Sequence, residues 1–234
     1  MASERMNRIL EDNIRFAKQA PYNFCDRWCE RCPSFIQRHC SLYQQQMEEK
    51  ITCIAHGREE DDLEVLKEVT RWHHEALDMD AGFPIDELVD IDLDDPEFET
   101  IKKHVTFVER HPLRKVADDY RRKAHLFLEI SRYRQEAVEP RLKEHFETLD
   151  RYHTLLPAKL NRALCGYHEP VAEGDISMHD AIAQFAVCKK AAQLSLSALT
   201  QLKTAYPMHG NALIELRRLL QGILSLVLKM EEAV

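Results

Sequence analysis

Glycine is scarce in this chain, with six among 234 residues. No glycine-rich loop of the kind that cradles phosphates is present, which excludes the common nucleotide-binding loops. Apolar runs are also short, and none approaches the roughly 20 residues that a membrane-spanning helix needs. The first twenty residues are polar and charged, unlike a secretory signal peptide. These absences predict a cytoplasmic protein that does not enter a membrane.

The residues that are abundant are typical of long helices. Alanine, leucine, glutamate, lysine and arginine dominate, and runs of β-branched residues are few. The C-terminal segment repeats apolar residues at helical spacing: Leu213, Leu216, Leu219, Leu220, Ile223, Leu224, Val227 and Leu228. We predict an all-α, mainly antiparallel helical bundle with a cysteine-rich metal-binding segment at its N-terminus. Its last helix is either a core helix or a seam for a homo-oligomer or another protein partner.

Prolines, glycines and capping residues set the expected boundaries. Pro140 and Pro157 should kink or divide the longest helical stretch. We group the N-terminal helix with the cysteine segment as residues 1–57, and expect one compact unit with a bundle over 58–234 that carries an acidic connector at 80–95. The expected helices cover 3–19, 34–56, 60–79, 96–110, 112–164, 177–205 and the segment from 211 onward.

The net charge of −8 conceals a strong asymmetry. Residues 59–99 contain seventeen acids and two bases, whereas residues 101–162 contain fifteen bases and nine acids. A basic helix face can bind phosphate-bearing partners. Acids are interleaved with bases there, as in the run from Asp118 to Lys123, which argues against a nucleic-acid partner. The alternative interpretations are that one segment lies against the other or that both are solvated faces.

The most informative stretch is FCDRWCERCP, residues 24–33. Four of the seven cysteines lie within sixteen residues at the spacing C-x3-C-x2-C-x7-C: Cys25, Cys29, Cys32 and Cys40. Clustered thiols in a chain without secretory features indicate metal or iron–sulfur ligands rather than disulfides. We predict that these four residues ligate zinc or a [4Fe-4S] cluster. A cysteine-rich apolar stripe that only packs is the alternative interpretation.

One uninterrupted helix could not deliver these thiols to one zinc ion. Cys25 and Cys32 would lie about 10 Å apart along its axis, whereas two sulfurs on one zinc are at most about 4.6 Å apart. Pro33 offers a break, because a proline pushes the preceding residue out of the α region. We expect one helical turn to present Cys25 and Cys29, and the break to bring in Cys32. Cys40 would close the set from the next helix. Four thiolates suggest a closed site, which favours a non-catalytic protein.

Two resemblances concern the same stretch. The first three cysteines match the C-x3-C-x2-C pattern of radical S-adenosylmethionine enzymes. Those enzymes resemble partial α/β barrels, whereas nothing in this sequence alternates strand with helix, and Arg31 stands where that family carries an aromatic residue. The segment CDRWCERCP, residues 25–33, is similar to an N-terminal signature of uncharacterised bacterial helical proteins. That resemblance covers Cys25 to Cys40 and implies no activity.

Two further functions stay open. Helical bundles can carry metal centres made of histidines and carboxylates. Such an enzyme would use His125, Glu129, Asp150 and His153, although the sequence contains no Glu-x-x-His pair of the kind that di-metal bundles use. The other alternative is a metal-free scaffold or protein-interaction module.

Overall fold

The computed structural model of the chain describes residues 4–19, 21–59, 62, 64, 96–133, 140–169 and 176–234. The chain divides into two compact units. The larger unit holds Met1–Gln19, Asn23–Asp26 and Thr100–Val234, and the smaller unit holds Ala20–Tyr22 and Arg27–Glu99. The N-terminal helix thus belongs to the larger unit. The helix expected over 60–79 and the acidic connector at 80–95 lie outside the described residues.

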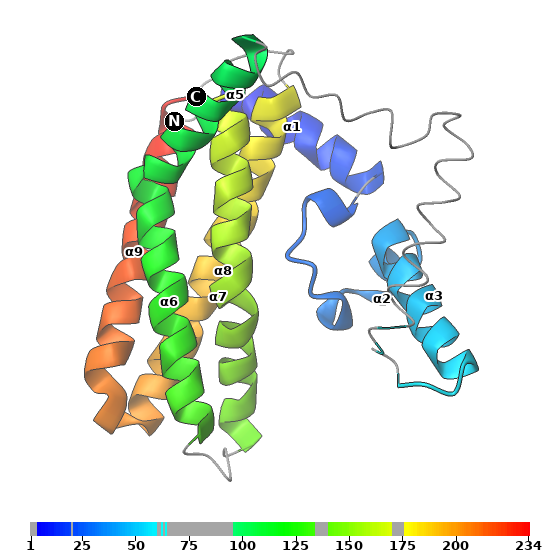
Figure 1. Cartoon of the computed structure of the whole chain (residues 1–234), viewed down its shortest axis with the longest axis vertical. Helices are drawn as coiled ribbons and strands as arrows, with labels where there is room; N and C mark the ends of the chain where they lie inside the picture. The colour runs from blue at the N-terminus through cyan, green and yellow to red at the C-terminus, as the bar shows by residue number, and fades with distance from the viewer. Residues whose placement is uncertain are drawn as a thin grey trace. The chain divides into compact units, whose positions relative to one another are not determined.

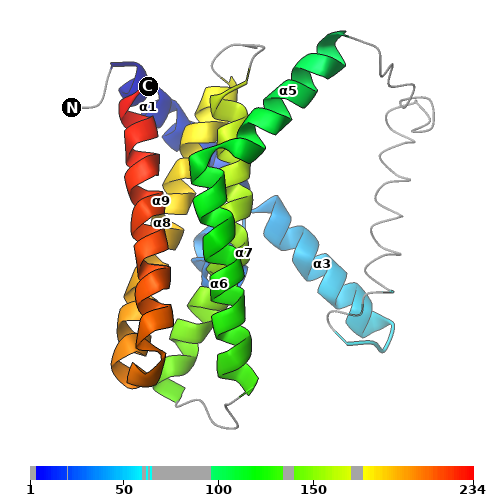
Figure 2. The ribbon, with the colours of Figure 1, turned by 60° about the vertical axis from the view of Figure 1, so that its left-hand side comes forward.

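Four long helices form the body of the larger unit. Each packs against the next, and the last also packs against the first. Consecutive helices run in opposite directions (Figures 1 and 2), which confirms the predicted all-helical, mainly antiparallel bundle. The four are α6 (Pro112–Tyr133), α7 (Pro140–Tyr167), α8 (Ile176–Ala205) and α9 (Gly210–Glu232).

The core lies between the apolar faces of these four helices. Its large, fully buried side chains include Tyr120, Leu160 and Phe185. The C-terminal stripe is part of this core, because six of its eight predicted members are buried: Leu213, Leu216, Leu219, Leu220, Ile223 and Val227. The core-helix interpretation of α9 is therefore confirmed. A homo-oligomer through α9 stays a prediction.

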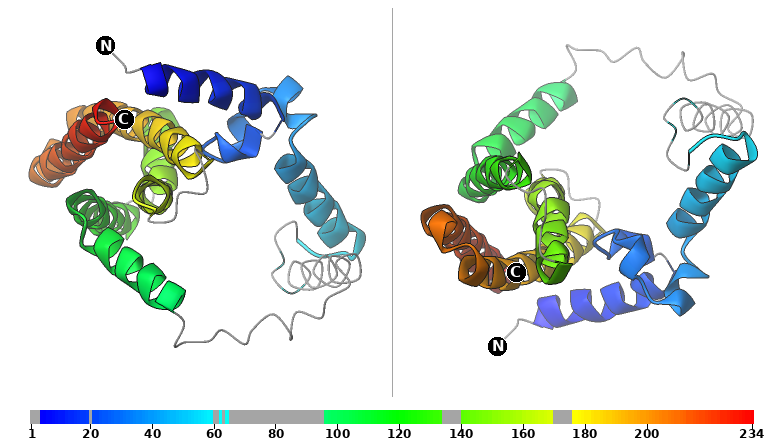
Figure 3. Two further views of the ribbon diagram at one scale, coloured as in Figure 1. Left: turned by 90° about the horizontal axis from the view of Figure 1, so that it is seen from above. Right: turned by 90° about the horizontal axis from the view of Figure 1, so that it is seen from below.

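Two further helices pack on the bundle. Helix α1 (Glu4–Gln19) lies against α8 (Figure 3) and buries Met6 and Ile9. The Asn13 side chain of α1 donates a hydrogen bond to the carbonyl oxygen of His179 at 3.0 Å. Helix α5 (Pro96–Arg110) precedes α6. A ring nitrogen of His104 lies 3.1 Å from the carbonyl oxygen of Cys165 in α7.

Prolines begin three of the described helices. Pro96 opens α5, Pro112 opens α6 and Pro140 opens α7, where a missing N–H costs nothing. We expected Pro157 to kink or divide its helix. Helix α7 instead continues through Pro157 without division. Neighbouring side chains donate to carbonyls at this point: Arg114 to the oxygen of Pro157 at 3.5 Å and the Cys188 thiol to that of Leu156 at 3.9 Å.

The described part of the smaller unit contains short elements. A 3-10 turn, η2 (Cys29–Arg31), precedes α2 (Ser34–Gln37) and α3 (Ser41–Ala55). The single helix expected over 34–56 is wrong, because hydrogen bonds between residues three apart tighten the chain after α2, ending with that from the Cys40 N–H to the Gln37 oxygen at 3.3 Å. Gly57, with φ of +68°, ends α3 as expected.

Among the described helices, none combines the length and the hydrophobicity that a membrane crossing requires.

Candidate functional site

The two central cysteines of the motif close one turn. The N–H of Cys32 donates a hydrogen bond to the carbonyl oxygen of Cys29 at 3.1 Å, which makes the turn a single step of 3-10 helix. Side chains three residues apart eclipse each other in this geometry. The two half-buried thiols therefore start from the same side of the turn. Cys32 is extended (φ −74°, ψ 137°), as expected for a residue before Pro33.

Gln37 connects this turn to the next cysteine. Its side-chain nitrogen donates to the carbonyl oxygen of Cys29 at 2.8 Å. Its own carbonyl oxygen accepts the hydrogen bond from the N–H of Cys40. Cys40 is buried, and it is the N-cap residue of α3, with extended backbone (φ −96°, ψ 108°). A single half-buried residue thus ties the Cys29 turn to the start of α3.

The segment around Cys25 is attached to the bundle by its neighbour Asp26. One carboxylate oxygen of Asp26 accepts a hydrogen bond from the Tyr152 hydroxyl at 2.7 Å and lies 2.9 Å from Nζ of Lys190. Its backbone oxygen accepts from Arg151 at 3.4 Å. Asp26 is 9% exposed and Tyr152 is 1% exposed. Because a buried carboxylate is costly unless it is paired, this arrangement fixes residues 23–26 on α7 and α8.

The residues between Asp26 and Cys29 have an unusual backbone. Arg27 adopts the left-handed conformation with φ of +54°, which costs a non-glycine residue about 1–2 kcal/mol. Beyond it, the guanidinium of Arg31 lies 3.7 Å from the centre of the Trp28 ring. A cation over an aromatic face is stabilising. The η2 turn therefore carries a positive charge stacked on its own tryptophan.

The structure describes the four cysteines of the predicted set but does not gather them in one place. Cys25 does not share a helical turn with Cys29, since residues 24–28 are not helical. Cys25 falls in the larger unit, and Cys29, Cys32 and Cys40 fall in the smaller one. Nowhere in the described chain do three or more histidine, cysteine or acidic side chains lie close enough together to hold a metal ion. The full set of four ligands stays a prediction.

The alternative histidine–carboxylate site is brought together only in part. The rings of His125 and His153 are stacked, with centroids 5.7 Å apart. His153 is buried and donates from Nδ1 to the backbone oxygen of Asp150 at 2.6 Å, which leaves Nε2 as its acceptor nitrogen. Of the four residues predicted for this site, the fold brings these two histidines together. Glu129 and Asp150 do not complete a group of metal ligands with them in the described structure.

Buried groups of the bundle offer poor nucleophiles. Burial raises the pKa of the Cys188 thiol and, to a smaller extent, that of Cys165. It also raises the pKa of Tyr120 to about 12, against a smaller opposing effect of the Ser195 hydroxyl. A thiol or phenol with a raised pKa is protonated at neutral pH, and the protonated form is the unreactive one. The complete burial of Cys188 fits a packing role for this thiol.

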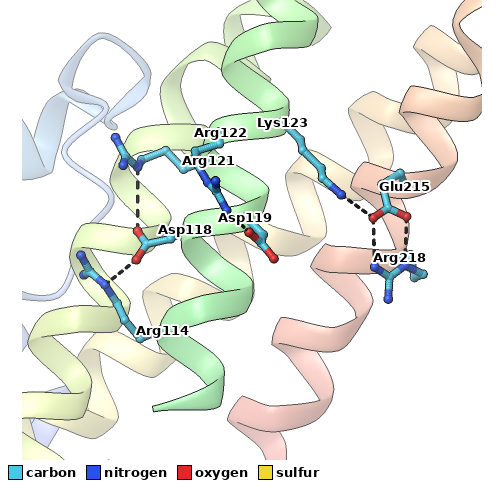
Figure 4. A network of polar contacts seen from close by, with 8 residues as sticks. All are labelled: Arg114, Asp118, Asp119, Arg121, Arg122, Lys123, Glu215 and Arg218. Carbon is cyan, nitrogen blue, oxygen red and sulfur yellow. Dashed lines mark hydrogen bonds and ion pairs between the residues drawn. The ribbon is translucent and has the colours of Figure 1, made fainter. Parts of the chain in front are cut away.

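The basic character of α6 is balanced by acids on the same helix and on α9. Asp118 pairs with Arg114 at 2.9 Å, and Asp119 pairs with Arg122 (Figure 4). Glu215 of α9 accepts from Lys123 at 2.7 Å and also from Arg218, and these hydrogen bonds lower the pKa of Glu215 to about 2. Exposed pairs of this kind contribute little stability. They neutralise much of the charge that a phosphate would need.

Sequence reasoning did not identify Asp26, Gln37 or Tyr152. The partners of Asp26 lie 126 and 164 residues away in the chain, so no local spacing marks it. Gln37 is one glutamine among several in the sequence. It connects Cys29 to Cys40 only because α2 ends at this residue. No protein-family model matches this chain, and no curated protein or solved structure is significantly similar to it.

Proposed function

We propose that this is a non-catalytic metal-binding helical protein in which Cys25, Cys29, Cys32 and Cys40 ligate zinc or a [4Fe-4S] cluster. The turn formed by Cys29 and Cys32 carries the proposal. Cysteines in the C-x2-C spacing are a common half of tetrahedral zinc sites. The 3-10 turn starts the side chains of this pair on one side of the backbone, which suits two ligands of one ion.

Gln37 supplies the second support. It holds the carbonyl of Cys29 with its side chain and the N–H of Cys40 with its backbone. Groups that orient ligands without touching the metal are a regular feature of metal sites. The three thiols of the smaller unit therefore belong to one hydrogen-bonded segment. Ligand convergence and metal binding are coupled in small thiolate sites, so the ion itself would complete the set.

The small core of this segment is the third support. Among the described residues of the smaller unit, only Cys40 and Cys53 are buried. Large apolar side chains are instead exposed there: Phe35, Met47, Ile51 and Ile54. Segments too small to bury a sufficient apolar core commonly depend on metals or disulfides for their stability. A thiolate-bound ion would stabilise the segment in this way.

Elemental analysis and an absorption spectrum of the anaerobically purified chain test the proposal. We expect either about one zinc per chain and no colour, or iron with sulfide and broad visible absorbance. The variant Cys29→Ser should lose the metal, whereas Cys165→Ser, the same chemical change in α7, should keep it. Metal retained after all four cysteines become serine would favour the histidine–carboxylate site. A well-folded protein without metal would favour a scaffold.

A further inference from the structure

Cys29 and Cys32 differ from the other cysteines in combining accessibility with proximity. Both thiols are half-buried, and one hydrogen-bonded turn joins their residues. Three other cysteines are buried: Cys40, Cys53 and Cys188. A small molecule in solution can therefore reach this pair, and each thiol has the other as a neighbour along the chain.

The spacing of the pair suits a covalent bond between the two sulfurs. A 3-10 helix rises about 2.0 Å per residue and completes a turn in three, so the two Cα atoms lie about 6 Å apart with their side chains eclipsed. Disulfides join Cα atoms about 4.4–6.8 Å apart, most often near 5.5–6 Å. The Cα spacing of the turn is therefore compatible with a disulfide. Little loop-closure entropy is lost, because the backbone has already closed the loop.

We propose that Cys29 and Cys32 are a redox-active dithiol that small-molecule disulfides convert to an internal disulfide, and that this conversion releases the metal. The second half rests on the proposed function, since it assumes that the same two thiolates are ligands. A disulfide sulfur is no longer a thiolate, and thiolates are the metal-binding form of cysteine. Oxidation therefore removes two of the four ligands at once.

The chemistry is two successive thiol–disulfide exchanges with oxidised glutathione as the oxidant. One cysteine thiolate attacks a glutathione sulfur, the glutathione S–S bond breaks, and one glutathione thiolate leaves. The second cysteine thiolate then attacks the mixed disulfide and expels the other glutathione thiolate. The protein loses two electrons and two protons. Glutathione gains both electrons, and the two protons convert the released thiolates to thiols.

Tryptic mapping of the full-length, metal-stripped protein tests the dithiol directly. Arg27, Arg31 and Arg38 bracket the pair, so trypsin separates Cys29 from Cys32. After treatment with oxidised glutathione and alkylation, we expect peptides 28–31 and 32–38 to be joined by a disulfide. Dithiothreitol should separate them. Glutathione adducts without this cross-link, or cross-links between other cysteines, would overturn the proposal.

Variants separate the two exchange steps. Cys32→Ser should stop after the first exchange and retain one glutathione on Cys29 as a stable adduct. Cys165→Ser keeps the pair and should behave like the wild-type protein. Cys29→Ser tests Cys32 as the attacking thiol in the same way. A wild type that forms the cross-link while neither variant carries an adduct would overturn the two-step exchange.

Metal release is measured separately on the metal-loaded chain with a chromogenic chelator. We expect one zinc ion, or the iron of one cluster, to be released for each Cys29–Cys32 disulfide formed. A reduced protein that contains no metal overturns the proposed function. The dithiol is then still tested by tryptic mapping. A metal-loaded protein that forms the disulfide and keeps its metal overturns the regulatory half of this inference alone.

Discussion

The four-helix bundle and the smaller unit bury their side chains to very different extents. Helix α7 of the bundle buries eleven residues, whereas α3 of the smaller unit buries one, Cys53. Burial of apolar surface stabilises the bundle at about 25 cal/mol per Å². The described part of the smaller unit has little of this contribution and instead has a high density of thiols. Under the proposed function, thiolate-bound metal would stabilise the smaller unit, whereas apolar burial stabilises the bundle.

Truncating one large apolar side chain in each unit should give the largest contrast. Leu160 is fully buried in α7, so Leu160→Ala should destabilise the bundle by about 2–5 kcal/mol. Ile51 is 59% exposed on α3, so Ile51→Ala should change stability by no more than about 0.5 kcal/mol. Urea unfolding followed by circular dichroism measures both. Equal losses would show that the smaller unit has a core after all.

Gly166 tests how closely the bundle helices pack. A Cβ added there would lie 2.7 Å from the backbone oxygen of Ser177, and that oxygen cannot rotate away. Gly166→Ala should therefore cost about 1–3 kcal/mol. Gly210 is the matched control, because it is helical and nothing lies within 4 Å of an added Cβ. Gly210→Ala should be neutral or stabilise by up to about 1 kcal/mol. Similar effects of both changes would contradict this account of the α7–α8 contact.

Asp26 tests the attachment of residues 23–26 to the bundle helices. Asp26→Ala leaves the buried Tyr152 hydroxyl without its acceptor, so we expect a loss of about 1–3 kcal/mol. Residues 23–26 should also detach, which limited proteolysis with trypsin detects as faster cleavage after the exposed Arg27. Asp119→Ala is the control, since Asp119 pairs with Arg122 on the exposed side of α6. Its effect should stay within about 0.5 kcal/mol. Unchanged cleavage in Asp26→Ala would refute the anchoring role.

Acid should weaken the junction of α5 and α6. Nδ1 of His111 accepts a hydrogen bond from the Leu113 N–H at 3.2 Å and so caps α6, which a protonated ring cannot do. Burial lowers the pKa of His111. The pKa of His168 is lowered by burial and by the nearby His111 and His104. As the pH falls, the unfolded chain therefore binds protons at a higher pH than the folded chain does. This stability should be complete above about pH 6.5 and be lost as the pH falls below that value.

Urea midpoints between about pH 7.5 and about pH 5.5 measure this loss, because the histidine pKa lies in that interval. The bundle midpoint should fall with pH. His111→Asn keeps a capping acceptor but does not titrate there, so its midpoint should fall less steeply. A variant profile as steep as that of the wild type would assign the pH dependence to other groups.

The bundle could be predicted because its determinants are local. Leucines at helical spacing in α9, and prolines at the starts of α5, α6 and α7, fix helices that then have one apolar face to bury. The continuity of α7 through Pro157 could not be predicted in this way, because Pro157 is buried in the packed bundle, where tertiary contacts override local helix propensity.

The cysteine motif was less predictable than the bundle. The local effect of Pro33 on Cys32 is as expected, because it depends on adjacent residues. The break that leaves Cys40 as an N-cap, and the attachment of Asp26 to Tyr152 and Lys190, depend on contacts that spacing does not encode. The expected pairing of Cys25 and Cys29 on one helical turn is wrong for the same reason, since the anchored segment is not helical.

The most direct test of the two sources of stability uses two spectroscopic probes on the reduced, metal-loaded chain. Both tryptophans, Trp28 and Trp72, fall within the smaller unit, whereas circular dichroism reports mainly the long bundle helices. Removing the metal with a chelator should shift the tryptophan emission and abolish its unfolding transition. The circular dichroism transition should keep its midpoint. Two outcomes would contradict the idea that thiolate-bound metal stabilises the smaller unit. One is loss of both transitions together, and the other is tryptophan emission that does not change when the chelator is added.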